Sequence, residues 1–240
     1  MKRCLAVILL MVSGTAAADF EMQYSDGTFG LVGDGRVLFG DANAAVLFVP
    51  GEEGMVVISH EERTWMRLKP GFVKDVKSQM QTQMDAMLAG MPPEQRAMVE
   101  QQMAGMMPQP DAMPKMEIRK TGTSAEVAGF DCDEIEIAYD TGGVEEVVCV
   151  ATARELGISN DDFDAMLRAM EGMAEIASMG GGEAAQLEFS KLGGIPVRTR
   201  ARGNGEDNEV VSIETSSVDP ARLQIPDNYR ETSIESMMGG

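Results

Sequence analysis

The chain has 240 residues and carries 39 Asp and Glu side chains against 20 Lys and Arg, which gives a formal net charge of −19. A chain this acidic repels the phosphates of nucleic acids and the headgroups of anionic lipids, and no cluster of Lys and Arg in the sequence offsets that repulsion. We therefore expect no nucleic-acid partner. The length is sufficient for one domain with a hydrophobic core.

The first 18 residues have the pattern of a secretory signal peptide. Lys2 and Arg3 precede an apolar run over residues 4–12, and small residues follow as far as Ala18. We expect cleavage before Asp19 and a periplasmic mature protein. The apolar run is shorter than the roughly 20 residues of a transmembrane helix, so no transmembrane segment is expected after cleavage.

Short β-like runs alternate with turn residues over residues 20–68. The runs are FEMQY, RVLFG, AVLFV, MVVISH and TWMRL, and Gly, Asp, Pro or charged residues separate them. Connections this short join antiparallel neighbours, so we predict a meander of four or five strands.

The period of the apolar residues becomes helical over residues 72–106. One face carries apolar side chains at steps of three and four, namely Val73, Val76, Met80, Met84, Met87 and Met91. Gly90 suits the end of a helix, and the proline pair that follows it suits the start of another. We predict a helical hairpin with a second arm over residues 93–105, which includes Met98.

The β pattern resumes in KMEIRKTGTSAEVAGF, FDCDEIEIAYD and GGVEEVVCVA. The last two runs indicate a hairpin centred between Asp140 and Thr141. Cys132 and Cys149 are equidistant from that centre, and they are the two cysteines that remain after cleavage. In an oxidising compartment we predict a disulfide between directly opposed residues, since the spacing is not that of a C-x-x-C redox motif.

A further helix is predicted near residue 160. Ser159 suits its N-cap, and Asp162 stands at the acidic position of a capping box. Its apolar stripe comprises Phe163, Met166, Leu167, Met170, Met173 and Ala177. Four residues also have the ligand spacing of an EF-hand calcium loop: Asn160, Asp162, Asp164 and Glu171. Ala165 stands where that loop needs Gly, so the helix cap is the better interpretation.

Two final strands are predicted within AAQLEFSKLGGIPVRTRARG and EVVSIETSSV. Together these patterns indicate an antiparallel sheet with helices inserted at two points, which is an α+β fold. We predict a single α+β domain over residues 19–231, with the helical insert at 72–106, and a flexible tail over residues 232–240.

The sequence lacks the residues of most catalytic sites. His60 is the single histidine, which argues against multi-His metal centres, and at the end of a strand we expect it to be solvated. No Walker loop, nucleotide-binding glycine motif, G-x-S-x-G elbow or H-E-x-x-H motif occurs. We therefore predict a protein that is not an enzyme and has no cofactor.

Three interpretations of the methionines remain open. Met fills irregular core space, so the stripe can simply pack the hairpin onto the sheet. Flexible thioethers also suit a surface that binds variable apolar shapes, such as acyl chains or hydrophobic protein segments. Thioethers finally select Cu(I), for which the candidate ligands are Met80, Met84, Met87 and Met91. A structural envelope protein without a ligand is a further alternative.

Several segments in this order resemble an exported bacterial family known as domain of unknown function 4412. They are MQYSDG, MVVISHEERTWMRL, QMQTQMDAMLAGMPPEQRAMVEQQM, VAGFDCDEIEIAYD and GIPVRTR. That family is similar to periplasmic lipoprotein carriers of the LolA and LolB type. The resemblance implies a curved antiparallel sheet, a half-barrel, whose concave face is closed by helices. It further implies that residues 72–105 form a lid over an apolar cavity that accepts acyl chains.

The resulting hypothesis is a periplasmic half-barrel with a Met-rich helical hairpin and one further helix against the sheet. It binds an apolar ligand, either an acyl chain or a hydrophobic protein segment, by burial of apolar surface. The residues expected at the ligand are Met80, Met84, Met87, Met91 and Met98.

Overall fold

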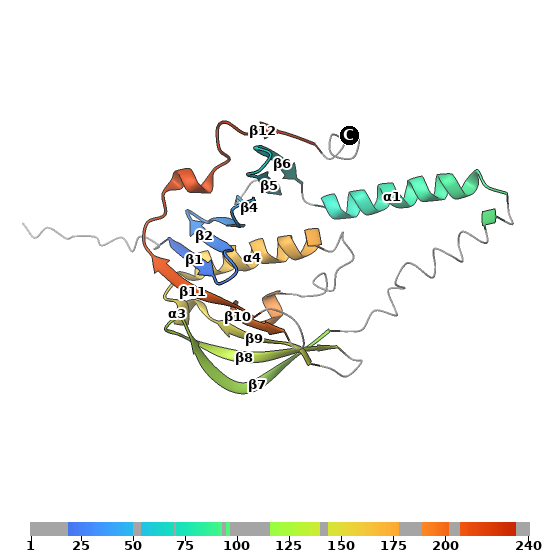
Figure 1. Ribbon diagram of the computed structural model, residues 1–240. Helices are drawn as coiled ribbons and strands as arrows, with labels where there is room; N and C mark the ends of the chain where they lie inside the picture. Colours follow the sequence, from blue (N-terminus) through green and yellow to red (C-terminus); the bar gives the residue numbers. More distant parts are fainter. Residues whose placement is uncertain are drawn as a thin grey trace, which may run out of the picture.

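The computed structural model describes residues 19–49, 54–69, 71–92, 95–96, 116–139, 144–177, 189–201 and 207–233. Within them, twelve strands form one open sheet in the order β12-β6-β5-β4-β3-β2-β1-β11-β10-β9-β8-β7 (Figure 1). Every pairing between the described strands is antiparallel except that of β12 with β6. The prediction of an antiparallel sheet combined with helices is confirmed, and the sheet is open. The predicted signal peptide, residues 1–18, lies outside the described residues.

The first half of the sheet is a meander in which each strand pairs with the next. Its strands are β1 (Phe20–Tyr24), β2 (Phe29–Gly33), β3 (Arg36–Gly40), β4 (Ala44–Phe48), β5 (Met55–Ser59) and β6 (Thr64–Leu68). The sequence pattern does not predict β2, because its glycines dilute the apolar run. Close packing explains the glycine at position 30, because a Cβ there would lie 3.0 Å from Met166 Cε and from Phe39 Cε1.

The second half is another meander, which joins the first through the pairing of β11 with β1. Its strands are β7 (Met116–Val127), β8 (Phe130–Tyr139), β9 (Val144–Ala151), β10 (Ile195–Ala201) and β11 (Asn208–Thr215). The predicted final strand pair corresponds to β10 and β11. Residues 189–191, which were included in the predicted strand run, instead form a short 3-10 helix, η4 (Phe189–Lys191).

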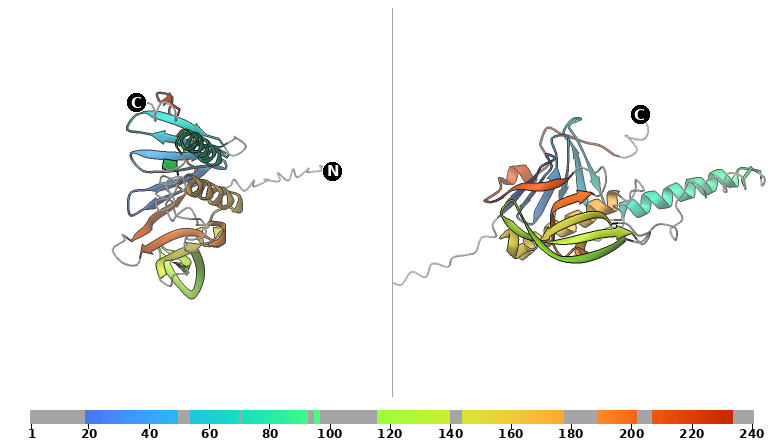
Figure 2. Two further views of the ribbon diagram at one scale, coloured as in Figure 1. Left: turned by 90° about the vertical axis from the view of Figure 1, so that its right-hand side faces the viewer. Right: turned by 60° about the horizontal axis from the view of Figure 1, so that its bottom comes forward.

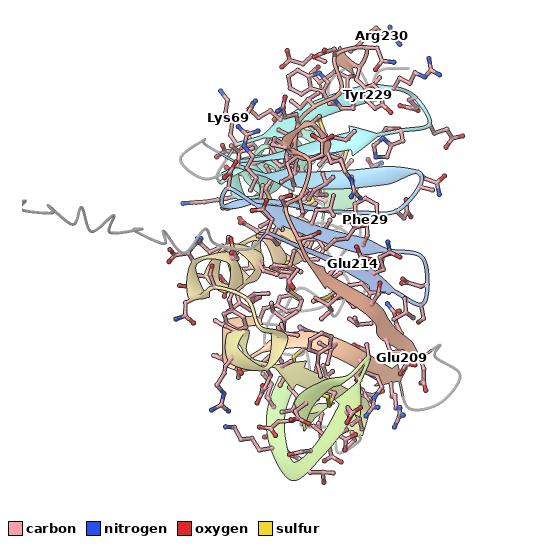
Figure 3. All side chains as sticks on the ribbon, turned by 90° about the vertical axis from the view of Figure 1, so that its left-hand side faces the viewer. Phe29, Lys69, Glu209, Glu214, Tyr229 and Arg230 are labelled. Carbon is pink, nitrogen blue, oxygen red and sulfur yellow. A yellow bond between two sulfur atoms is a disulfide. The ribbon has the colours of Figure 1, made fainter. Side chains whose placement is uncertain are left out.

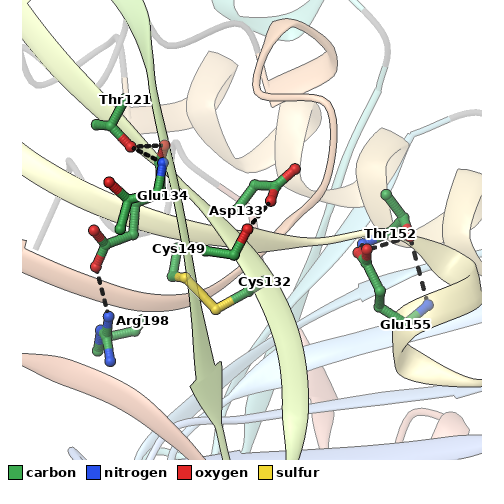
Figure 4. The surroundings of a disulfide bond; sticks show 10 residues. Thr121, Cys132, Asp133, Glu134, Cys149, Thr152, Glu155 and Arg198 are labelled. Atoms are coloured by element: carbon green, nitrogen blue, oxygen red, sulfur yellow. Dashed lines mark hydrogen bonds and ion pairs between the residues drawn. A yellow bond between two sulfur atoms is a disulfide. The ribbon is translucent and has the colours of Figure 1, made fainter.

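The disulfide between Cys132 and Cys149 is confirmed, with a Cα–Cα distance of 5.5 Å (Figure 4). The predicted register is wrong, because Cys149 pairs with Glu134 rather than with Cys132. The register of β8 and β9 shifts between Ile137 and Ala138. Side chains alternate along a strand, so residues 132 and 134 share a face and the cysteines are diagonal neighbours.

Helix α4 (Asn160–Ala177) lies across one face of the sheet, which we call the inner face, against β2, β3 and β10 (Figures 1 and 2). The predicted cap is present. The Ser159 hydroxyl donates to Asp162 Oδ2 at 2.6 Å and accepts from Asp162 N at 3.1 Å. Of the predicted stripe, Met166 and Met170 are buried, and Phe163, Leu167 and Met173 are partly buried against the same core; Ala165 and Ala169 are buried beside them.

A shorter helix, α3 (Ala153–Leu156), precedes α4 and is not among the predicted elements. Thr152 and Glu155 form its capping box: the Glu155 carboxylate accepts from Thr152 N at 2.7 Å, and Thr152 Oγ1 accepts from Glu155 N at 3.5 Å (Figure 4). Sequence periodicity does not reveal a helix of four residues, because it is too short to show a full apolar repeat.

The C-terminal segment, residues 216–233, covers the opposite, outer face of the first meander (Figure 3). It contains η5 (Pro220–Leu223) and β12 (Arg230–Glu231). The buried side chains in this layer are Leu31, Leu38, Ala45, Leu47, Val56, Ile58, Val218 and Leu223. The end of the segment is held at β6, where Arg230 N donates to Arg63 O at 3.0 Å and Thr232 N donates to Trp65 O at 2.8 Å.

An ion pair ties this C-terminal segment to β1. Arg222 donates from Nη1 to Glu21 Oε2 at 2.6 Å and from Nη2 to Glu21 Oε1 at 3.1 Å. These hydrogen bonds lower the pKa of Glu21 below its ordinary 4.5. Because the folded pKa is depressed, the pair stabilises the fold above that ordinary pKa, and its contribution is lost as the pH falls through the folded pKa.

We expect Arg222→Met to lower the free energy of unfolding at about pH 7 by less than about 1 kcal/mol, because the guanidinium is half exposed. The difference from the parent protein should shrink towards about pH 3, because the carboxylate becomes increasingly protonated as the pH falls. Urea unfolding at both pH values measures it. Arg200→Met is the control, since Arg200 and Asp207 are both exposed and 3.7 Å apart; an equal pH dependence in that variant would contradict the assignment to Glu21.

Candidate functional site

Helix α1 (Phe72–Ala89) begins beside β6 and extends beyond the sheet (Figures 1 and 2). Gly71 precedes it with a φ of 78°, a left-handed conformation that favours glycine. Val73, in the first turn, is buried, whereas the other described side chains of α1 are half-buried or exposed. The helix corresponds to the predicted first arm, and after its first turn it is not covered by the sheet.

The chain turns at the end of α1. Arg96 donates from Nε to Leu88 O at 2.9 Å and from Nη2 to Ala89 O at 3.4 Å, so its positive charge lies at the carbonyl end of the helix. Arg96 N also donates to Pro92 O at 3.0 Å, which is one helical turn. Residues 97–115 lie outside the described residues, so the second arm of the hairpin stays a prediction.

Three of the five methionines predicted at the ligand can be placed. Met84 is half-buried, Met87 is 55% exposed, and Met91 is half-buried just after the helix. Met80 belongs to α1, but its side chain is not described, and Met98 lies outside the described residues. We call Met80, Met84, Met87 and Met91 the methionine stripe. Steps of three and four place the first three on one side of α1, and Met91 follows the end of the helix.

The inner face carries α4 rather than the described part of the hairpin. Met166 is fully buried there and Met170 is nearly so. Gly172 allows a close approach to β5, because a Cβ at that position would lie 2.8 Å from Met55 Sδ. The described methionines that pack this face therefore include Met166 and Met170 of α4, Met55 of β5 and Met22 of β1. The lid that the carrier resemblance implies for residues 72–105 is not confirmed.

His60 has a partner in the C-terminal segment. Its Nδ1 lies 3.0 Å from the Tyr229 hydroxyl, and the two rings meet edge to face with centroids 5.8 Å apart. The expected solvated histidine is therefore half-buried and joins β5 to the outer layer. In the described part of the chain, no three His, Cys, Asp or Glu side chains are grouped to hold a metal ion.

The raised pKa values of Tyr24 on β1 and Glu146 on β9 have structural causes. Burial raises the pKa of Tyr24, whose hydroxyl donates to Pro196 O at 3.1 Å. Burial, followed by repulsion from Glu145, raises the pKa of Glu146. Neither group lies beside a nucleophile in a described cavity, so these shifts do not identify a catalytic site.

Two cavities lie on the outer face, between the first meander and the C-terminal segment. One measures about 380 Å³ and the other about 320 Å³. Arg36, Val49 and Gln224 line both of them, so the cavities are adjacent, and we call them together the outer groove. The remaining lining residues are Gly33, Asp34, Leu47, Val56, Arg67, Pro220, Leu223 and Ile225.

Sequence reasoning missed the outer groove because its two arginines are far apart in the chain. Arg36 begins β3, and Arg67 lies on β6. The signal that places them on one face is alternation: the outer-facing residues Leu38, Leu47, Val56 and Arg67 are paired in turn across β3, β4, β5 and β6. That row becomes visible only when the register is known.

Within the described residues, no helix is both long enough and apolar enough to cross a membrane. A search of curated protein sequences finds no match to the chain.

Among solved structures, two crystal forms of PNGF-II are similar over 93% of this chain, with 9% sequence identity and TM-scores of 0.34 and 0.33. This chain spans about a third, 32% and 33%, of the length of those chains.

The model of one protein family, described as domain of unknown function (DUF4412), matches residues 55–229. That segment runs from β5 to the residues before β12 and includes α1, the disulfide and α4. The chain belongs to the DUF4412 family.

Proposed function

We propose that this protein is an exported, non-enzymatic binding protein that holds an apolar chain on the methionine stripe of α1. The observation that carries the proposal is the exposure of that helix. α1 has 18 residues, yet Val73 in its first turn is its one buried side chain among those described. Met87 and Val211 are the exposed large hydrophobic residues of the described chain.

An apolar partner suits such a helix for a physical reason. Isolated helices of this length are marginally stable in water, and most helices in proteins are stabilised by packing of an apolar face. A ligand that covers the methionine stripe supplies that packing and stabilises the complex by about 25 cal/mol per Å² of apolar surface buried. Flexible thioethers adapt to an acyl chain or to a hydrophobic protein segment without a fixed shape.

Two features support export as part of this proposal. A buried disulfide is typical of proteins that fold in an oxidising compartment. Strand β1 starts at Phe20, and the Asp19 carboxylate accepts a hydrogen bond from Val218 N at 3.0 Å. Cleavage before Asp19 therefore leaves every described strand and this contact in place.

Native mass spectrometry of the protein, purified from periplasm without detergent, tests the proposal. We expect an adduct in the lipid mass range that disappears on denaturation, and a denatured mass that corresponds to a chain starting at Asp19 with its disulfide formed. If the native mass is free of adduct, phospholipid and a hydrophobic peptide are added separately. Binding of one but not the other identifies the ligand class, and binding of neither overturns the proposal.

Three variants locate the site. Replacing Met84 and Met87 by Gln should remove the adduct, whereas replacing both by Leu should keep it, because apolar volume is conserved. The Leu pair lacks the thioethers, so a retained adduct also separates this function from Cu(I) binding. Val211→Gln is the matched control, since Val211 is also 55% exposed but lies on β11. An adduct that persists in the Gln pair would place the ligand elsewhere.

A further inference from the structure

The described methionines differ sharply in their contact with solvent. Met22 and Met166 are fully buried in the core between α4 and the sheet, and Met170 is nearly so. Met87, on α1, is 55% exposed and is the one exposed methionine in the part of the chain that the structure describes. A thioether must meet an oxidant to react with it, so exposure decides which methionine is oxidised first.

The methionines of α1 do not hold the fold together. Neither Met84 nor Met87 belongs to a hydrophobic cluster of the described core, and α1 extends beyond the sheet after its first turn (Figure 1). Met166, in contrast, packs opposite Gly30 on β2. Oxidation at α1 therefore changes the surface of that helix and leaves the core between α4 and the sheet intact.

A peroxide supplies the balanced reaction. The sulfur lone pair of methionine attacks one oxygen of hydrogen peroxide, the O–O bond breaks, and the proton of the transferred oxygen passes to the departing hydroxide, which leaves as water. The sulfur loses two electrons and gains one oxygen atom. Methionine sulfoxide reductases reverse the change: two thiols become a disulfide, and the oxygen leaves as water.

The sulfoxide is polar where the thioether is apolar. Steps of three and four place Met84 and Met91, both half-buried, on either side of Met87 along the stripe. An oxygen in the middle of that stripe needs a hydrogen bond, which an alkyl chain cannot donate. Burying the oxygen without a partner is unfavourable, so oxidation at position 87 opposes binding of an apolar chain.

We propose that Met87, together with Met84 beside it, is a site of reversible sulfoxidation by peroxide that switches off apolar binding by the methionine stripe. The inference rests on the function proposed for that stripe and states how the function is regulated. The buried methionines of α4 and β1 keep the protein folded while the stripe is oxidised.

Limited treatment of the folded protein with hydrogen peroxide, followed by peptide mapping by mass spectrometry, tests the modification site. We expect Met87 to be oxidised at least about tenfold faster than Met166, with an unchanged urea midpoint as long as Met166 is unmodified. Protein treated in urea is the control, since the two methionines should then react at similar rates. Equal rates in the folded protein, or a loss of stability that accompanies oxidation of Met87, overturns the proposal.

Native mass spectrometry of the same samples tests the switch, with phosphatidylcholine and a hydrophobic peptide added separately as probes. The fraction of protein that carries the bound probe should fall at least about tenfold once Met87 is oxidised, and methionine sulfoxide reductases should restore it. Unoxidised protein carried through the reductase step controls for the thiol reductant. A bound fraction that survives oxidation of Met87 overturns the switch.

The variant Met84→Leu/Met87→Leu assigns the effect to these two positions. It has no thioether there, so peroxide should change its bound fraction less than about twofold relative to the same variant before treatment. A variant that loses binding to the same extent as the parent would place the sensitive methionine elsewhere and contradict the assignment. A parent that binds neither probe before treatment instead contradicts the function proposed for the stripe, and peptide mapping still decides the modification site.

Discussion

Met166→Ala is expected to lower the free energy of unfolding by about 3 kcal/mol, because it creates a cavity between α4 and the sheet. Met166 is fully buried, and its Cε lies 3.0 Å from the position that a Cβ of Gly30 would take. The packing of α4 on β2 therefore depends on a large side chain opposite a glycine. Urea unfolding followed by circular dichroism measures the change.

Met87→Ala is the matched control for that measurement. The two substitutions remove the same atoms from a helix and gain the same helix propensity from Ala, so these contributions cancel in the comparison. Met87 is 55% exposed, and we expect a change within about 0.5 kcal/mol. Similar losses in the two variants would contradict the assignment of Met166 to the core and of Met87 to the surface.

Loss of the Cys132–Cys149 disulfide is expected to lower the free energy of unfolding by about 3 kcal/mol. The bond joins residues 17 apart, and closing a loop of that length restricts the unfolded chain by about this amount. Both cysteines are 1% exposed, so the double replacement by Ala removes some packing as well. The variant Cys132→Ala/Cys149→Ala is compared with the parent by urea unfolding.

A reductant provides the control for the disulfide. The parent protein should be destabilised when unfolding is measured with dithiothreitol, whereas the double-Ala variant should not respond, since the one other cysteine of the sequence, Cys4, lies in the segment that the proposed cleavage removes. A parent protein whose unfolding midpoint is the same with and without the reductant would contradict a stabilising bond. The difference between the reduced parent and the variant then measures the packing of the two sulfur atoms.

Helices α4 and α1 show what an apolar sequence pattern predicts and what it does not. The sequence predicts α4 with its cap at Ser159 and Asp162, and the described residues of its stripe pack on the core, because caps and apolar periodicity are encoded within a few turns. α1 has an equally regular stripe, yet α4 lies on the inner face. A stripe indicates that one side of a helix is apolar, but it does not indicate which surface covers that side.

The candidate sites differ in the same way. The residues of the methionine stripe lie close together in the sequence at helical spacing, so they could be predicted from it. Their ligand stays a proposal. The outer groove could not be named, since Arg36 and Arg67 meet only through the pairing of four strands and the return of residues 220–225 over them. Considered alone in the sequence, each of these two arginines is expected to be an ordinary exposed side chain.

The sequence by itself determined the features that depend on neighbours within a few residues: most strands, the position of α4 and its cap, and the partners of the disulfide. Only the tertiary structure decided that Cys149 lies opposite Glu134, that β2 is a strand despite Gly30, that the C-terminal segment adds a parallel strand at β6, and that α4 covers the inner face. The physical reason is that register, strand order and face selection minimise exposed apolar surface over the whole chain, and this sum depends on contacts between segments that are distant in sequence.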